Sequence, residues 1–208
     1  MAVSMPLTCL FYTVAGYLSG CMMYAYWLPK WLKGVDVRAY GEDRNPGAAN
    51  ATRACGLPVG VLCALMDILK GTVPVALAIW VGQLTGWYMV PVVLAPVSGH
   101  AWPIFFGGRG GKAIAVSFGV LIGLMPPILL APLWAVLLLI CLPFIHDHRE
   151  LIITTSALMA IGTFLLYPMP HIRAIACGVA SILMIKHRKK PAPLSSGEML
   201  PPDDAMSA

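Results

Sequence analysis

Residues 98–119 read S-G-H-A-W-P-I-F-F-G-G-R-G-G-K-A-I-A-V-S-F-G and lie between two apolar runs. Four glycines surround Arg109 in this stretch, and Lys112 follows the last of them. The glycines are Gly107, Gly108, Gly110 and Gly111. Glycine lacks a Cβ, so a ligand can approach this backbone closely and its N–H groups can point at one acceptor. Lys112 precedes an apolar run that looks helical, where a helix N-terminus adds positive potential. The stretch therefore predicts a phosphate site, and a tight turn between two spans is the alternative.

Two nucleotide-binding motifs of soluble proteins do not fit this stretch. The P-loop pattern requires a glycine where Phe106 stands and a serine or threonine where Ala113 stands. Gly108, Gly110 and Ala113 weakly mimic a dinucleotide fingerprint, but no βαβ pattern surrounds them. A phosphate held by a membrane protein remains the better interpretation.

The composition indicates an integral membrane protein. Only 11% of the 208 residues are charged and 59% are hydrophobic, whereas a soluble domain carries about 25% charged residues. The apolar runs are of the length of membrane helices and do not show the alternation of a membrane barrel. We expect an all-α polytopic protein, with residues 1–190 as a single transmembrane domain and residues 191–208 as a disordered cytoplasmic tail.

Seven transmembrane helices fit the apolar runs, and five is the alternative if the last four pair into fewer, longer spans. Basic residues cluster in every second connection, which the positive-inside rule places in the cytoplasm. The N-terminus is then outside and the C-terminus cytoplasmic. The expected spans are residues 5–28, 54–81, 88–97 with an extension to 106, 113–125, 128–145, 151–166 and 174–185.

The first polar loop carries a second candidate site. Asn45 and Asn50 can each donate and accept hydrogen bonds beside the glycine Gly47. Arg38 and Arg53 offer planar guanidinium groups that suit phosphate oxygens. A solvated positive loop would also need arginine and glycine, but it would not need the two asparagines.

Asp67 and Lys70 are three residues apart inside the second span, a spacing that places them on the same side of a helix. Ionisable groups within a span usually face the protein interior. We expect either a structural ion pair or a pair that lines a polar cavity.

No metal site is expected. The six cysteines form no C-x-x-C pair and fall in or beside apolar runs, so they suit small apolar fillers. His146 and His148 are two residues apart and would diverge on a helix. The one plausible protein base in the glycine stretch is His100, for which a structural hydrogen-bonding role is the alternative.

Four stretches in order resemble the bacterial acyl-phosphate:glycerol-3-phosphate acyltransferases. They are D-V-R-A-Y-G at 36–41, N-P-G-A-A-N-A-T-R-A-C-G at 45–56, D-I-L-K-G-T-V-P-V at 67–75, and G-H-A-W-P-I-F-F-G-G-R-G-G-K-A-I-A at 99–115. The similarity covers about residues 30–120, and the expected span count and orientation agree along the rest of the chain.

The resemblance implies transfer of a fatty acyl group from acyl phosphate to the first hydroxyl of glycerol 3-phosphate. The products are lysophosphatidic acid and phosphate, in the first step of phospholipid synthesis at the inner membrane. It implies that no metal, coenzyme A or acyl carrier protein is needed directly. We expect no cofactor and no nucleic-acid partner, and the oligomeric state stays open. The expected catalytic residues are Lys112, Arg53 and His100. The expected substrate-binding residues are Arg38, Asn45, Gly47, Asn50, Gly107, Gly108, Arg109, Gly110 and Gly111.

Three stretches depart from the family's usual pattern, and the first of them reads G-C-M-M at 20–23 where the family often has G-S-x-P. Residues 41–45 read G-E-D-R-N where the family usually reads G-S-G-N, so a serine is replaced and one residue is inserted. Residues 186–191 read K-H-R-K-K-P where the family's last motif reads like R-H-R-E-N-I. A non-catalytic paralogue or carrier that keeps the phosphate-binding loops is therefore the alternative function.

Overall fold

The computed structural model describes residues 4–41, 43–125 and 128–188, and within them it contains helices and no strand. The expected all-α fold class is confirmed for this part of the chain. Glu42, the Pro126–Pro127 pair and the tail at 191–208 that we expect to be disordered lie outside the described residues.

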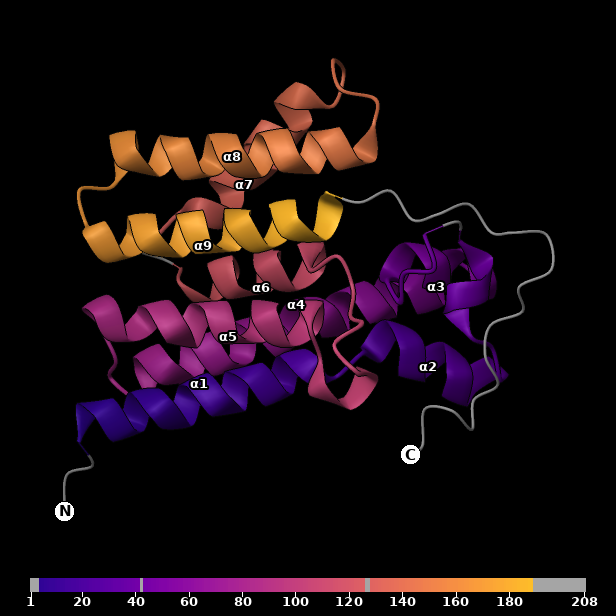
Figure 1. Ribbon diagram of the computed structural model, residues 1–208, viewed down its shortest axis with the longest axis horizontal. Helices are drawn as coiled ribbons and strands as arrows, with labels where there is room; N and C mark the ends of the chain where they lie inside the picture. Colours follow the sequence, from indigo (N-terminus) through magenta and orange to yellow (C-terminus); the bar gives the residue numbers. More distant parts are fainter. Residues whose placement is uncertain (1–3, 42, 126–127, 189–208) are drawn as a thin grey trace.

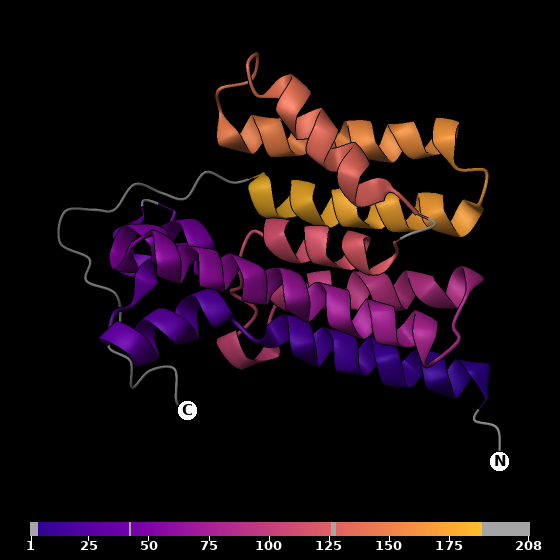
Figure 2. The ribbon, with the colours of Figure 1, turned by 180° about the vertical axis from the view of Figure 1, so that it is seen from behind.

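The helices form layers whose axes are roughly aligned (Figure 1). Helix α1 packs on α5, α4 on α6, and α8 on α9, and the contact of α5 with α9 joins the layers. Helix α7 lies obliquely across the bundle and is seen best from behind (Figure 2). The helices are α1 (Met5–Cys21), α2 (Tyr24–Lys33), α3 (Ala48–Cys55), α4 (Leu57–Trp80), α5 (Met89–Ala101), α6 (Ile114–Gly123), α7 (Leu130–Cys141), α8 (His148–Leu166) and α9 (Pro170–His187), with 3₁₀ turns η1 (Val37–Tyr40), η2 (Gly86–Tyr88) and η3 (Ile104–Phe106).

The first expected span is two helices rather than one. Helix α1 ends at Cys21, and α2 begins at Tyr24 after a bend of 42°. The break leaves the Met22 carbonyl free of the helix ladder, and Lys70 Nζ donates to it at 2.6 Å. Ser19 Oγ in turn donates to the Lys70 carbonyl at 2.9 Å. A polar side chain of α4 therefore satisfies the backbone that the break exposes.

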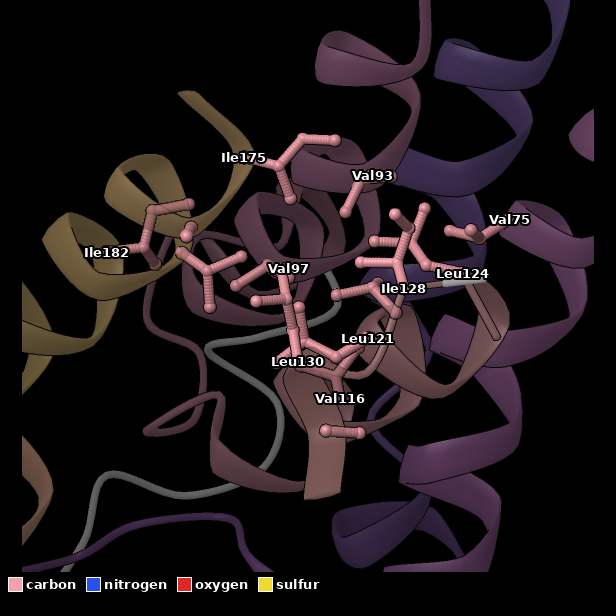
Figure 3. Close-up of a cluster of buried hydrophobic side chains, with 14 of the residues drawn as sticks. Val75, Val93, Val97, Val116, Leu121, Leu124, Ile128, Leu130, Ile175 and Ile182 are labelled. Atoms are coloured by element: carbon pink, nitrogen blue, oxygen red, sulfur yellow. The ribbon is translucent and has the colours of Figure 1, made fainter. Parts of the chain in front are cut away.

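Branched aliphatic side chains from α4, α5, α6, α7 and α9 meet in the core of the bundle (Figure 3). Beside them, the rings of Phe118 and Trp134 stack with centroids 4.4 Å apart, and the Trp134 indole donates to Thr155 Oγ1 at 3.1 Å. Large apolar side chains also cover the outside of the bundle, such as Phe11 and Leu165. A bilayer solvates such a surface, whereas water would not.

Two glycines let neighbouring helices approach to backbone contact. A Cβ at Gly20 of α1 would lie 2.2 Å from the Pro96 carbonyl oxygen of α5. A Cβ at Gly119 of α6 would lie 2.1 Å from the Ile68 carbonyl oxygen of α4. Small residues commonly play this part where membrane helices pack. The second contact fixes α6 against the part of α4 that carries Asp67 and Lys70.

Three segments of the described chain are long and apolar enough to cross a membrane: Leu57–Trp80, Gly86–Phe106 and His148–Leu166. The bent pair α1–α2 is a fourth candidate if it counts as one span. Helices α6 and α7 are apolar but shorter. At 1.5 Å per residue, the ten residues of α6 rise about 15 Å, about half of a typical hydrocarbon core. Seven spans therefore stay a prediction.

The charged connections gather at one end of the bundle, to the right in Figure 1. Helices α2 and α3, the glycine stretch, the start of α8 and the end of α9 all lie there. The N-terminus, the α4–α5 connection and the α8–α9 connection lie at the opposite end. This arrangement agrees with the alternation of basic and uncharged connections in the sequence.

Candidate active site

A cavity of about 980 Å³ opens at the charged end of the bundle, between the first polar loop, α3, α4 and the start of α6. Lys112 and Asp43 lie at its accessible part, with side chains 31% and 26% exposed. Asp67 and His100 line its buried part. The remaining wall is largely apolar and includes Ile68, Ile114 and Phe118. The cavity thus combines charged groups with a surface that suits an acyl chain.

Asp43 and Lys112 form the ion pair at the accessible part of the cavity. Lys112 Nζ lies 2.6 Å from Asp43 Oδ2. Asp43 Oδ1 accepts hydrogen bonds from Asn50 Nδ2 at 3.0 Å and from the Asn45 backbone N–H at 3.2 Å. Arg53 then donates to Asn50 Oδ1 at 2.7 Å. One hydrogen-bonded network therefore joins the first polar loop to the lysine of the glycine stretch.

The electrostatics of this network keep the Asp43 carboxyl ionised. Burial raises the pKa of Asp43, but hydrogen bonds from Lys112 and Asn50 and the lysine's charge outweigh burial and lower the pKa below its usual value. The carboxylate is therefore a full negative charge at neutral pH, and it lies directly against Lys112.

A second cluster closes the buried part of the cavity. Lys70 Nζ lies 2.8 Å from Asp67 Oδ1, which confirms the ion pair expected from their spacing, and both side chains are almost fully buried. The same ammonium group lies 2.7 Å from His100 Nδ1. An ammonium group only donates, so Nδ1 accepts and the ring proton of a neutral His100 is on Nε2. Lys70 therefore fixes the tautomer and the orientation of His100.

The glycine stretch folds around His100 instead of surrounding the cavity. The N–H groups of Gly108, Arg109 and Gly111 donate to the carbonyls of Pro103, Phe106 and His100, each at 3.0 Å. A Cβ at Gly111 would lie 2.2 Å from His100 Nε2, so only glycine permits this contact without a shift of the ring. Three of the N–H groups that we expected to face a phosphate are therefore used inside the loop.

Lys186, from the end of α9, holds the glycine stretch from outside. Its Nζ donates to the Ala101 carbonyl at 2.8 Å and to the Gly110 carbonyl at 3.4 Å, and it lies over the Trp102 ring. At the other end of the stretch, Ala113 adopts a left-handed φ of 64° immediately before α6. Strained backbone of this kind collects at functional sites, and here it directly follows Lys112.

The structure brings part of the expected site together. The expected residues that line the cavity are Lys112, Arg53, His100, Asn45 and Gly47, and Asn50 joins them through the Asp43 network. Arg38 lies elsewhere, paired with Asp36 at 2.5 Å and placed over the Tyr26 ring. Arg109 and the four glycines Gly107, Gly108, Gly110 and Gly111 do not line the cavity.

Several lining residues were not among the expected site residues, and two of them, Asp43 and His148, carry titratable groups from outside the helices of the expected site. His148, the first residue of α8, reaches the cavity from a distant part of the sequence. Asp43 lies in the loop that carries the inserted residue. The departure of this loop from the family pattern was the signal in the sequence that could have identified Asp43. For His148 the only signal was its place in a charged connection on the same predicted side as the glycine stretch.

Comparisons with known proteins point to one family of membrane enzymes. The family model described as "Glycerol-3-phosphate acyltransferase" matches residues 10–197. A glycerol-3-phosphate acyltransferase of Halalkalibacterium halodurans is 34% identical over 88% of this chain and 90% of its own. One from Shouchella clausii is 34% identical over 95% of both chains. The crystal structure of PlsY, an integral membrane glycerol 3-phosphate acyltransferase, in its glycerol 3-phosphate form superposes with a TM-score of 0.77 at 30% identity, over 86% of this chain and 88% of that chain.

Proposed function

The chain belongs to the glycerol-3-phosphate acyltransferase family, and we propose that the acyl donor of its reaction is an acyl phosphate. It is an integral membrane enzyme that acylates glycerol 3-phosphate. The similarity to these enzymes extends over nearly the whole chain, which favours this activity over a non-catalytic carrier. The proposed reaction gives lysophosphatidic acid. A second PlsY structure is described as the lysophosphatidic acid form, and it matches this chain with a TM-score of 0.76 at 29% identity.

The cavity is the observation that carries the proposal. Its charged part holds Lys112 and Arg53, which suit the phosphate groups of both substrates. Its apolar wall, with Ile114 and Phe118, suits the fatty chain of the donor. A water-soluble phosphate ester and a lipid phosphate would need this combination at the end of a membrane bundle.

The chemistry requires positioning and charge neutralisation more than a protein nucleophile. The acceptor hydroxyl oxygen attacks the acyl carbonyl carbon, and the bond from that carbon to the phosphate oxygen breaks. The hydroxyl proton goes to the departing phosphate, which is a good leaving group by itself. Lys112 and Arg53 oppose the negative charge that develops. His100, held by Lys70 through Nδ1, contributes a fixed hydrogen-bonding group at the buried part of the cavity.

The experiment for this function measures phosphate release by the purified full-length protein. We expect release from palmitoyl phosphate that depends on glycerol 3-phosphate and matches the lysophosphatidic acid formed. Palmitoyl-coenzyme A in place of palmitoyl phosphate should give no product. Turnover with the coenzyme A ester and none with the acyl phosphate would contradict the proposed donor.

We propose that the cavity faces the cytoplasm of the cell inner membrane and that α1, α4, α5, α6, α7, α8 and α9 each cross the bilayer. The support is the basic charge at this end of the bundle and the presence of a helix within each expected span, the first of which is broken into α1 and α2. The N-terminus is then outside.

Cysteine accessibility tests this orientation in a variant whose six native cysteines are replaced. Single cysteines introduced at Ala39 and Arg109 should react with a membrane-impermeant maleimide only in inside-out vesicles. A cysteine at Thr85 should react only from the outer face of intact cells. Labelling of the Arg109 and Thr85 positions from the same side would overturn the orientation.

A further inference from the structure

The Asp43 carboxylate lies directly against the Lys112 ammonium group in the charged part of the cavity. Its carboxylate receives three donors of different kinds: the Lys112 ammonium, the Asn50 amide and the Asn45 backbone N–H. Ammonium, amide and backbone N–H donors are those that proteins use for phosphate oxygens. A residue of the chain thus satisfies a donor set that suits an anionic ligand.

The loop that carries Asp43 is shaped for this contact. Arg44 has a left-handed φ of 46°, and its N–H donates to the Gly41 carbonyl at 3.0 Å, which reverses the chain around Asp43. Asn50, which is almost fully buried, holds the turn through the Asn45 carbonyl at 2.8 Å as well as through Asp43 itself. The carboxylate is therefore directed into the cavity by several contacts.

The ion pair is also open enough to be displaced. About a quarter of the Asp43 side chain and a third of the Lys112 side chain remain exposed. Ion pairs in contact with water are weak, and a doubly charged phosphate attracts the ammonium more strongly than one carboxylate does. A phosphate can therefore replace the Asp43 carboxylate at Lys112 without unfolding the site.

We propose that Asp43 is an internal anion that holds the phosphate position of this enzyme, so that a substrate phosphate must displace its carboxylate from Lys112. This inference rests on the proposed function. The carboxylate competes with every anion that binds at Lys112. It lowers the affinity of singly charged ligands more than that of doubly charged ones. Asp43 is thus a residue that determines specificity for a phosphate dianion.

A general-base role for Asp43 fits the geometry less well. A base must be free to accept the acceptor's proton and should have a pKa near the working pH. Asp43 Oδ2 is engaged by Lys112, Oδ1 accepts two hydrogen bonds, and the pKa of the carboxyl is held below its usual value. These contacts suit a counter-ion.

Steady-state kinetics of Asp43→Ser and Asp43→Asn test the proposal. Serine is the residue of the family pattern, and asparagine keeps the shape while removing the charge. We expect the KM for one phosphate substrate to fall about fivefold in both variants, the upper value for loss of an exposed ion pair, with kcat within about threefold of wild type. A fall in the KM for palmitoyl phosphate would assign the position to the donor, and a fall for glycerol 3-phosphate would assign it to the acceptor.

The matched control is Glu150→Gln, which removes one exposed negative charge at the same end of the bundle but outside the cavity. It should leave both KM values unchanged. Unchanged or higher KM values in both Asp43 variants would overturn the proposal. A loss of kcat of a hundredfold or more at unchanged KM would also overturn it and would indicate the general base.

Binding of inorganic phosphate, measured by titration calorimetry, separates this inference from the proposed function because it requires no turnover. We expect Asp43→Ser to bind phosphate about fivefold more tightly than wild type. The additional substitution Lys112→Ala should abolish this gain. Equal phosphate affinity in wild type and Asp43→Ser would contradict the internal anion even if the enzyme is active. The expected gain in an enzyme without acyl phosphate activity would support the internal anion and reject only the proposed donor.

Discussion

Lys112→Ala is expected to lower kcat/KM with acyl phosphate about a hundred- to a thousandfold. Lys112 is the lysine that lines the cavity, and its ammonium group already binds an anion there. Loss of one such contact in a preorganised site typically removes about 3–4 kcal/mol of transition-state stabilisation. Steady-state turnover of the purified variant measures the effect.

Two further variants test whether the effect is specific to the ammonium group of Lys112. Lys112→Arg should recover only part of the activity, because a planar guanidinium group does not reproduce a compact ammonium group. Arg109→Ala should have a much smaller effect, because Arg109 is exposed and does not line the cavity. If Lys112→Ala keeps most of the wild-type turnover, or if Arg109→Ala loses more, the phosphate position has been misassigned.

Stability must be separated from catalysis in this variant. Lys112→Ala leaves the half-buried Asp43 carboxylate without its counter-ion, which by itself can disturb the first polar loop. The double variant Asp43→Ser/Lys112→Ala removes both charges and should fold like wild type. We expect it to remain as inactive as the single lysine variant, because the missing cation and not the stranded carboxylate limits the reaction.

The features of the fold that depend on local pattern were predictable from the sequence. The apolar runs predicted helices, and each expected span after the first corresponds to a helix of the bundle, whereas the first is broken into α1 and α2. The three-residue spacing of Asp67 and Lys70 predicted their ion pair. The glycine stretch correctly predicted that Lys112 lies close to the start of a helix, because Lys112 directly precedes Ala113, the N-cap residue of α6. In each case residues close in sequence decide the geometry.

The features that depend on distant contacts were not predictable in the same way. The break after Cys21 comes one residue after Gly20, but a single glycine in an apolar run does not predict a break, and the break is stabilised by Lys70 of another helix. The N–H groups of the glycine stretch are directed by the His100 and Phe106 carbonyls, which a sequence pattern does not place. Asp43 reaches Lys112 because two loops far apart in sequence meet at one end of the bundle.

The cluster of Asp67, Lys70 and His100 leads to the largest expected effect on stability. All three residues are at most 4% exposed, inside the helical bundle. Removal of one partner of a buried ion pair leaves an uncompensated charge and typically costs about 3–5 kcal/mol. We therefore expect Asp67→Asn and Lys70→Met each to lower the free energy of unfolding by about this amount, measured by chemical unfolding in detergent.

The two single variants should not be equivalent. Lys70 lies against Asp67 and also donates to the Met22 carbonyl and to His100 Nδ1, so its loss leaves His100 Nδ1 without this donor and the Met22 carbonyl with the Tyr24 N–H alone. Lys70→Met should therefore destabilise the protein more than Asp67→Asn and should also lower kcat, because His100 loses the contact that fixes its tautomer.

The double variant Asp67→Leu/Lys70→Met decides whether the charge pair itself causes the loss. Replacing both members of a buried pair by apolar residues of similar size is often neutral, so this variant should be more stable than Lys70→Met alone. Part of the loss should remain, because His100 Nδ1 still lacks the Lys70 donor and the Met22 carbonyl keeps only the Tyr24 N–H. If the double variant is no more stable than the worse single variant, pairing with Asp67 contributes nothing and the bond from Lys70 to the helix break carries the stability instead.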